Sequence, residues 1–257
     1  MALALGCGMG QKAKVEAPPA PVAPPPPLHV DKGRSRLVGL MCPQGAAGRP
    51  ALAALAQREP RAWKTDAAAL RRAIAQLRTP ELAVLGFDGH RAGWFTSAGL
   101  VESALAPAAA VGAYAGGLPC ADELTATECQ AVSQSCGVAI GSPDGDDPTP
   151  AMRPGGCVDG KSIVIDIDGD GRPEAFSLEA LARLDEEVTG GVARAPCDAR
   201  FAFAAGHDLD VLAVADIDGD GRIELVVSRR GDPFRKVALY TAETTFRLTR
   251  ISVIEVR

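Results

Sequence analysis

Residues 216–224 read DIDGDGRIE, and residues 166–174 read DIDGDGRPE. The two copies start 50 residues apart, since 216 minus 166 is 50. An apolar run precedes each copy (SIVI and LAVA), and a second apolar run follows it (EAF and IELVVS). Residues 82–96 repeat this order more loosely, with LAVLGFDG leading into WFT. An apolar run, a Gly/Asp turn and a second apolar run are typical of a β-hairpin, so the sequence predicts a repeated hairpin unit.

Both acidic stretches place carboxylates at positions 1, 3, 5 and 9 and glycines at positions 4 and 6. Glycine adopts the backbone angles of a sharp turn, which lets the carboxylates converge on one point. Crowded carboxylates repel one another, and a hard cation such as Ca²⁺ binds six to eight oxygens in a flexible shell. The alternative is an acidic surface turn without an ion, which the near-identical repetition disfavours. The predicted Ca²⁺ ligands are Asp166, Asp168, Asp170, the Arg172 carbonyl and Glu174, and then Asp216, Asp218, Asp220, the Arg222 carbonyl and Glu224.

The residue spacing argues against an EF-hand, more strongly for the second loop than for the first. An EF-hand loop needs a bidentate Glu at position 12 and a helix on each side. Position 12 is Ser177 in the first loop and Val227 in the second, and the second loop has β-rich flanks. An EF-hand or dockerin remains an alternative for the first loop, because residues 177–188 (SLEALARLDEEV) have the pattern of a capped helix.

The pattern D-x-D-G-D-G-x-x-[DE] between two strands resembles the FG-GAP/VCBS repeats of integrin-like β-propellers. Residues 211–257 resemble one blade, with strands at 211–216, 223–228, 236–241 and 246–256. The looser unit has Gly86, Asp88, His90 and Trp94 at the ligand positions and is not expected to bind calcium. A propeller needs four to eight blades. We therefore expect an α+β fold with a β-rich C-terminal half and FG-GAP-like hairpins, with a small or incomplete propeller as the alternative.

The sequence outside the acidic stretches predicts strands, helices and loops that support the fold and carry no recognisable chemistry. Residues 36–41 (RLVGLM) favour a strand, and residues 50–78 have helical character, interrupted at Pro60. Within that region Leu70, Ala73, Ile74 and Leu77 share one helical face, with Thr65 or Asp66 as N-cap. Residues 101–160 are expected to form loops and short helices held by disulfides. The expected divisions are 1–10, 11–33, a mixed α/β region at 34–160 and the calcium-binding repeats at 161–257.

The N-terminus has features of an exported protein. Residues 1–10 read MALALGCGMG, and residues 3–7 resemble a bacterial lipobox in which Cys7 is lipidated and only the tail of a signal peptide precedes it. Residues 15–27 (VEAPPAPVAPPPP) predict an extended, proline-rich spacer. Together they predict a membrane-anchored lipoprotein on the outer membrane or periplasmic face. A chance match at Cys7, and a disordered tail or SH3-type ligand in the proline-rich stretch, remain alternatives.

Six cysteines follow Cys7, an even number that allows three disulfides in an oxidising compartment. The alternative is buried free thiols in a cytosolic protein. The disulfide candidates are Cys42, Cys120, Cys129, Cys136, Cys157 and Cys197.

Composition narrows the function classes. The net charge of -5 argues against a nucleic-acid partner, and no apolar run is long enough to span a membrane as a helix. Hydrolase signatures such as G-x-S-x-G and H-E-x-x-H do not occur in the sequence. The leading hypothesis is a non-catalytic, calcium-binding envelope lipoprotein that presents a protein or glycan interaction surface. The alternatives are an extracytoplasmic hydrolase that uses His207, and a purely structural envelope component.

Overall fold

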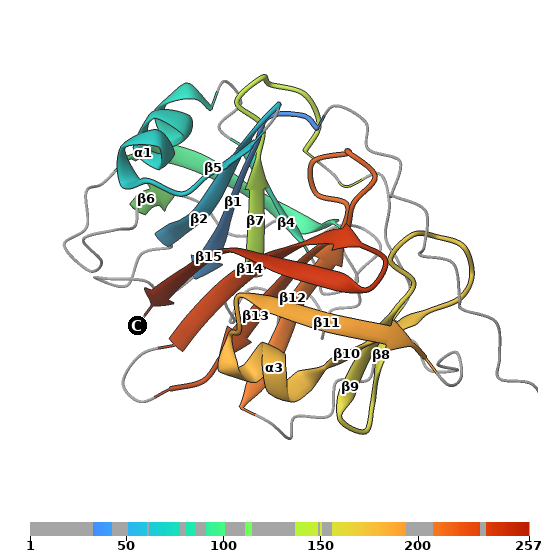
Figure 1. Ribbon diagram of the computed structural model, residues 1–257. Helices are drawn as coiled ribbons and strands as arrows, with labels where there is room; N and C mark the ends of the chain where they lie inside the picture. Colours follow the sequence, from blue (N-terminus) through green and yellow to red (C-terminus); the bar gives the residue numbers. More distant parts are fainter. Residues whose placement is uncertain are drawn as a thin grey trace, which may run out of the picture.

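The computed structural model describes residues 33–42, 51–60, 62–77, 81–85, 91–100, 111–114, 137–148, 150, 156–193, 208–231 and 235–256. These residues are rich in β-strand and include two short helices (Figure 1). The strands form a seven-stranded and an eight-stranded sheet. All strand pairings found in the described part of the chain are antiparallel.

The first sheet has the strand order β1-β7-β4-β5-β6-β2-β3, and an additional pairing joins β1 to β2. Its pairings therefore close into a ring of strands, and β3 extends the sheet from β2. Closure satisfies the backbone groups that an edge strand would leave unpaired. The strands are β1 (Arg36–Cys42), β2 (Ala51–Glu59), β3 (Ala62–Lys64), β4 (Glu81–Leu85), β5 (Arg91–Leu100), β6 (Val111–Tyr114) and β7 (Gly137–Gly141).

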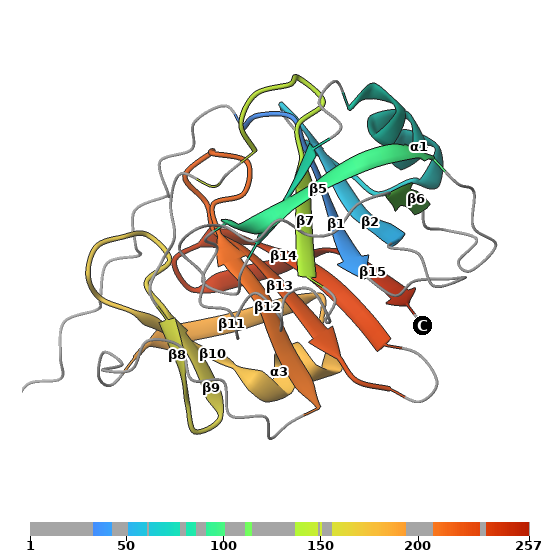
Figure 2. The same ribbon diagram turned by 180° about the vertical axis from the view of Figure 1, so that it is seen from behind.

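The second sheet has the order β12-β13-β14-β15-β11-β10-β9-β8 and curls around its own core (Figure 2). Its strands are β8 (Gly156–Asp159), β9 (Ser162–Ile165), β10 (Glu174–Ser177), β11 (Glu187–Val192), β12 (Leu209–Ala215), β13 (Glu224–Arg229), β14 (Arg235–Thr244) and β15 (Arg247–Val256). The first acidic loop (residues 166–174) joins β9 to β10, and the second acidic loop (residues 216–224) joins β12 to β13. All three predicted pairs of strands are confirmed as antiparallel, since β4 also pairs with β5 in the looser unit.

The two sheets pack against each other through alternating strand residues. On β13, Val226 faces the first sheet, whereas Leu225 and Val227 face the core inside the second sheet. Burying each such side chain contributes roughly 1.5–3 kcal/mol. The inter-sheet cluster contains Val38, Leu40, Leu55, Ala56, Val138 and Ile140 from the first sheet, and Ala213, Ala215, Ile217, Val226, Val237 and Leu239 from the second.

The same packing determines where the acidic loops lie. Each loop has an isoleucine at its second position, and both isoleucines are buried. Ile167 packs into the core inside the second sheet, whereas Ile217 packs into the inter-sheet cluster. The second acidic loop is therefore anchored at the junction of the sheets, and the first is anchored in the second sheet alone.

The two helices cover opposite ends of the molecule in both views (Figures 1 and 2). Helix α1 (Ala67–Gln76) begins at Asp66, whose side chain accepts a hydrogen bond from Ala69 N at 2.8 Å. The predicted apolar face, Leu70, Ala73, Ile74 and Leu77, packs against β1 and β2. Helix α3 (Leu178–Arg183) begins at Ser177, whose hydroxyl accepts from Ala180 N.

Several sequence-based expectations were wrong. Residues 51–59, expected to be helical, form β2, which pairs with β1, β3 and β6. Within residues 101–160, the described parts include β6, β7 and β8 where loops and helices were expected. The described part of the N-terminal half is therefore also rich in strands. An EF-hand is excluded for the first acidic loop because strands β9 and β10 flank it. Sheets of seven and eight strands also differ from the four-stranded blades of the propeller alternative.

Candidate metal sites in two acidic loops

The two acidic loops fold in the same way. In the first loop, Ile167 N donates to Glu174 Oε2 at 3.0 Å and Gly171 N donates to Asp166 Oδ2 at 3.0 Å. The corresponding distances in the second loop are 2.9 Å to Glu224 Oε2 and 3.1 Å to Asp216 Oδ2. Each loop is thus closed by its own first and last carboxylates.

Glycine makes this closure possible. Gly169 and Gly171 have φ values of 71° and 81°, and Gly219 and Gly221 have 74° and 84°. Residues with a Cβ rarely adopt these angles, because the Cβ meets the backbone carbonyl. The identical placement of the glycines explains why the two loops share one backbone shape.

Each loop brings three carboxylates together. Asp166, Asp168 and Glu174 have oxygens within 4.8 Å of one another, as do Asp216, Asp218 and Glu224. Each set could hold a metal ion, and a donor set made only of oxygen is suited to hard cations.

The predicted ligands at positions 5 and 7 are not among these clustered carboxylates. Asp170 and Asp220 lie outside these clusters, and their Oδ1 atoms accept from Arg172 N at 2.7 Å and Arg222 N at 2.9 Å. These bonds fix the position-5 carboxylates against the turn. The Arg172 and Arg222 carbonyls remain predicted ligands.

Glu174 in the first loop, and Asp216, Asp218 and Glu224 in the second, have raised pKa values. Burial, together with the neighbouring Asp168, Asp166 and Asp170, raises the pKa of Glu174 to about 7. In the second loop, burial and the adjacent Asp220 raise the pKa of Asp218 to about 7. Burial also raises the pKa of Asp216 and, more strongly, that of Glu224. Both loops therefore hold concentrated negative charge that a bound cation would stabilise.

The first loop retains an oxygen that suits a cation. Asp166 Oδ1 is buried and has no hydrogen-bond partner. Asp168 Oδ2 accepts from the Thr245 hydroxyl at 3.1 Å, which orients this carboxylate from the turn between β14 and β15. Among the residues that the structure describes, no Lys or Arg forms an ion pair with a carboxylate of this loop. A buried, unpartnered carboxylate oxygen is costly, so the loop fits a metal ion.

The second loop already has a cation beside it. Arg58 on β2 places Nε 2.5 Å from Asp218 Oδ2 and Nη2 2.9 Å from Asp220 Oδ2. Its guanidinium also lies over the Trp63 ring, 5.5 Å from the centroid. The cation comes from the first sheet and pairs with carboxylates of the second.

Sequence reasoning did not find Arg58, Thr241 or Thr245. Thr241 donates to Glu224 Oε1 at 2.9 Å from β14. Arg58 is separated from Asp220 by 162 residues, and no local pattern signals such a contact. Arg58 lies opposite Trp63 because of the register of the β2–β3 pairing, which follows only once residues 51–59 are known to form a strand.

Most of the other residues singled out in the sequence lie outside the described part of the chain. Cys7, the proline-rich spacer, the looser unit's turn and His207 lie outside the described residues, as do Cys120, Cys129, Cys136 and Cys197. Cys42 lies on β1, and Cys157 is buried on β8. Disulfide pairing among these cysteines stays a prediction.

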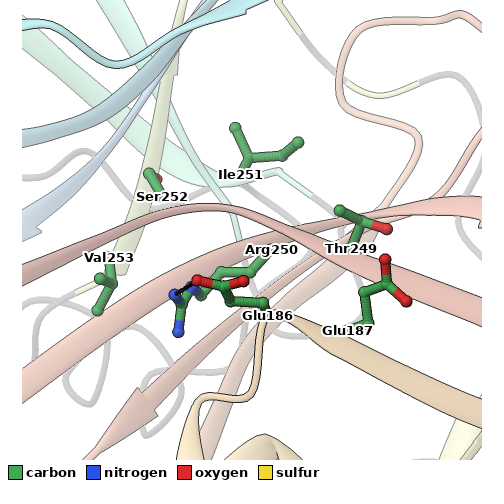
Figure 3. A pocket seen from close by; sticks show the side chains of 7 residues that line it. All are labelled: Glu186, Glu187, Thr249, Arg250, Ile251, Ser252 and Val253. Carbon is green, nitrogen blue, oxygen red and sulfur yellow. Dashed lines mark ion pairs between the residues drawn. The ribbon is translucent and has the colours of Figure 1, made fainter.

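A separate pocket of about 470 Å³ lies along β15 (Figure 3). Arg250 and Glu186 form an ion pair of 3.5 Å across it. The Thr249 and Ser252 hydroxyl oxygens are buried without a hydrogen-bond partner. The lining residues are Glu186, Glu187, Thr249, Arg250, Ile251, Ser252 and Val253.

Comparison with known proteins finds no relative: no family model matches the chain, and neither a curated protein nor a solved structure does. The described helices are all too short or too polar to cross a membrane.

Proposed function

We propose that this chain is a non-catalytic calcium-binding protein of the bacterial cell envelope, in which calcium braces the first acidic loop. The observation that carries the proposal is the buried, unpartnered Asp166 Oδ1 within the cluster of Asp166, Asp168 and Glu174. The donors are all oxygens, and a glycine-rich loop gives the adaptable coordination that Ca²⁺ accepts and Mg²⁺ does not.

The FG-GAP/VCBS resemblance supports the same metal, because both loops keep the D-x-D-G-D-G-x-x-E pattern between paired strands. The first loop has the surroundings of a calcium site. The second shares its backbone shape but has Arg58 beside it.

Calcium in this role is structural. Extracellular calcium modules bind with dissociation constants of about 10⁻⁴–10⁻³ M, so about 1 mM calcium would stabilise the fold by roughly 0.4–1.5 kcal/mol per site. Such an ion braces a loop and is poorly suited to buffering or to sensing small concentration changes.

Thermal unfolding of the full chain in calcium and in chelator tests this proposal. Calcium should raise the melting temperature of the wild type, whereas magnesium at the same concentration should do little. Asp166→Asn/Asp168→Asn should abolish the calcium effect, and the exposed Glu187→Gln should preserve it. A wild type that melts at one temperature in calcium and in chelator contradicts the proposal.

The envelope location is proposed from the N-terminal sequence. Cys7 in a lipobox-like setting and the proline-rich spacer would hold the folded part away from a membrane. Metabolic labelling with a fatty-acid analogue in a bacterial host, using the gene with its upstream sequence, should label the wild type and leave Cys7→Ala unlabelled. Equal labelling of both proteins, or of neither, contradicts lipidation at Cys7.

We propose that the chain also presents a surface that binds a protein or glycan. The pocket on β15 supports this, since it brings carboxylates and a guanidinium group together in one recess (Figure 3). A glycan array probed with the full chain should give binding that Arg250→Ala weakens. Binding that Arg250→Ala leaves unchanged would place the surface elsewhere.

A further inference from the structure

The two acidic loops share a backbone shape and differ in what faces their carboxylates. In the second loop, Asp220 N donates to Asp218 Oδ1 at 2.9 Å, and Arg222 N donates to Asp220 Oδ1 at 2.9 Å. One oxygen of each carboxylate is thus used by the turn, and the Oδ2 atoms are left for a cation. Arg58 contacts both of these Oδ2 atoms.

The first loop has the same two backbone bonds, but no Lys or Arg in the described part of the chain pairs with its carboxylates. Asp170 N donates to Asp168 Oδ1 at 3.2 Å, as in the second loop. Asp168 Oδ2 faces the neutral hydroxyl of Thr245, which can keep its hydrogen bond while the carboxylate binds a metal. Asp166 Oδ1 has no partner, whereas the equivalent Asp216 Oδ1 accepts from Gly219 N at 2.8 Å. In the second loop Asp218 Oδ2 also accepts no hydrogen bond, but it lies 2.5 Å from Arg58 Nε. Among the described residues, Asp166 Oδ1 of the first loop has neither a hydrogen-bond donor nor a cation beside it.

The arginine is held in place by its surroundings. Its side chain is only 12% exposed, and it stacks on Trp63 across the β2–β3 pairing. Arg34 N donates to the Asp218 carbonyl at 2.8 Å, which brings the chain before β1 onto the loop. At Gly33 a Cβ would lie 2.8 Å from Asp218 Oδ2 and 2.9 Å from Arg58 Nε, so the packing leaves no space there for a side chain.

We propose that Arg58 is the resident cation of the second acidic loop, so that calcium binds the first loop alone and the second loop fastens the two sheets together. This inference rests on the proposed function, in which the first loop binds calcium. The chain would thus carry two copies of one loop with different tasks.

The energetic reason is competition for the same oxygens. Calcium at the second loop would have to displace two ion-pair contacts, one of which (Nη2 to Asp220 Oδ2) is a charge-assisted hydrogen bond, and leave a largely buried guanidinium without its partners. A loop of this type binds calcium with a dissociation constant of only about 10⁻⁴–10⁻³ M when nothing competes. Because Arg58 already contacts these oxygens, the calcium dissociation constant of the second loop should lie above the millimolar range.

Site-resolved calcium titration by NMR tests the proposal on the full chain. The amides of Gly171 and Gly221 donate to Asp166 and Asp216, so each reports on one loop. In the wild type, calcium chloride should shift the Gly171 amide resonance with millimolar saturation and leave Gly221 unchanged. In Arg58→Gln, Gly221 should also shift, with a dissociation constant at least about tenfold lower than in the wild type. Arg72→Gln, on the exposed face of α1, is the matched control and should behave as the wild type.

A second variant keeps the test independent of whether Arg58→Gln folds. Asp166→Asn/Asp168→Asn retains Arg58 and should show no calcium response at either glycine. Saturation of Gly221 in this variant, or of both glycines equally in the wild type, overturns the role of Arg58 but leaves calcium binding intact. No response at Gly171 or Gly221 in any protein overturns the proposed function itself.

Discussion

The backbone N–H of Ile167 donates to Glu174 Oε2 at 3.0 Å, across the full length of the first acidic loop. This bond ties the buried side of the turn to the carboxylate at its end. Glu174 is 3% exposed, so its protonation depends on burial and on the neighbouring carboxylates. The pKa of about 7 is the consequence, and it gives the loop a measurable response to pH.

Calcium affinity at the first loop should fall as pH decreases through 7. Calcium binds the carboxylate, so below pH 7 it must displace a proton from Glu174, and the dissociation constant should rise up to about tenfold per pH unit. Calorimetric titrations at pH 8, 7 and 6 measure this. Glu174→Gln should bind more weakly, with a shallower pH dependence. An affinity that is constant from pH 8 to pH 6 contradicts the prediction.

Stability in chelator should show the reverse dependence. The folded pKa of Glu174 lies above its ordinary value of 4.5, so the folded state holds the proton more tightly. This contribution to the free energy of unfolding is complete below pH 4.5 and is lost as pH rises through about 7. Denaturant unfolding should show a loss of about 1–3 kcal/mol that is absent from Glu174→Gln. Saturating calcium should also remove it.

Removing the arginine of the second loop should destabilise the protein strongly. Arg58→Met leaves Asp218 and Asp220 buried without a cation, which costs about 3–5 kcal/mol when one partner of a buried pair is lost. Denaturant unfolding in chelator measures this cost, and Arg72→Met is the exposed control. Adding Asp218→Asn should recover part of the loss. If Arg58→Met costs no more than Arg72→Met, the ion pairs do not hold the sheets together.

Two glycines distinguish backbone strain from lost space. A Cβ at Gly169 or at Gly191 would meet no neighbouring atom within 4 Å, but of the two only Gly169 has a positive φ. Gly169→Ala should therefore cost about 1–2 kcal/mol and weaken calcium binding, whereas Gly191→Ala should be nearly neutral. Chemical unfolding and calcium titration of both variants provide the comparison. Equal effects would mean that the loop does not need the left-handed conformation.

Acid should release a different ion pair. Arg36, 2% exposed, donates to Asp146, and this guanidinium lowers the Asp146 pKa to about 2. Because the folded pKa is lowered, the contribution is present above the ordinary value of 3.8 and is lost as pH falls to about 2. Since Asp146 is partly exposed, we expect about 1 kcal/mol after solvent screening. The free energy difference between wild type and Asp146→Asn should shrink over this window, while the exposed Asp144→Asn should match the wild type throughout.

Local patterns in the sequence predicted local structure well. The hairpins around the acidic loops, the strand at residues 36–41 and helix α1 with Asp66 as its cap are all confirmed. Each depends on residues close in sequence, such as Asp66 and the Ala69 amide. The four predicted C-terminal strands are also confirmed as neighbours in one meander.

Long-range contacts account for what the sequence did not reveal. Residues 51–59 (ALAALAQRE) have the alanine content of a helix, but pairing with β1, β6 and β3 makes them a strand. That strand then carries Arg58 to the second acidic loop. Two nearly identical loops therefore differ in their contact with Arg58, which no comparison of the loop sequences could identify.

A crystal structure of the full chain grown with about 5 mM calcium, with anomalous data collected to locate the ion, would show directly whether calcium occupies the first acidic loop. We expect an anomalous peak in the first acidic loop, about 2.3–2.6 Å from oxygens of Asp166, Asp168 and Glu174, with Asp166 Oδ1 among its ligands. A first loop without an anomalous peak at that calcium concentration would contradict it.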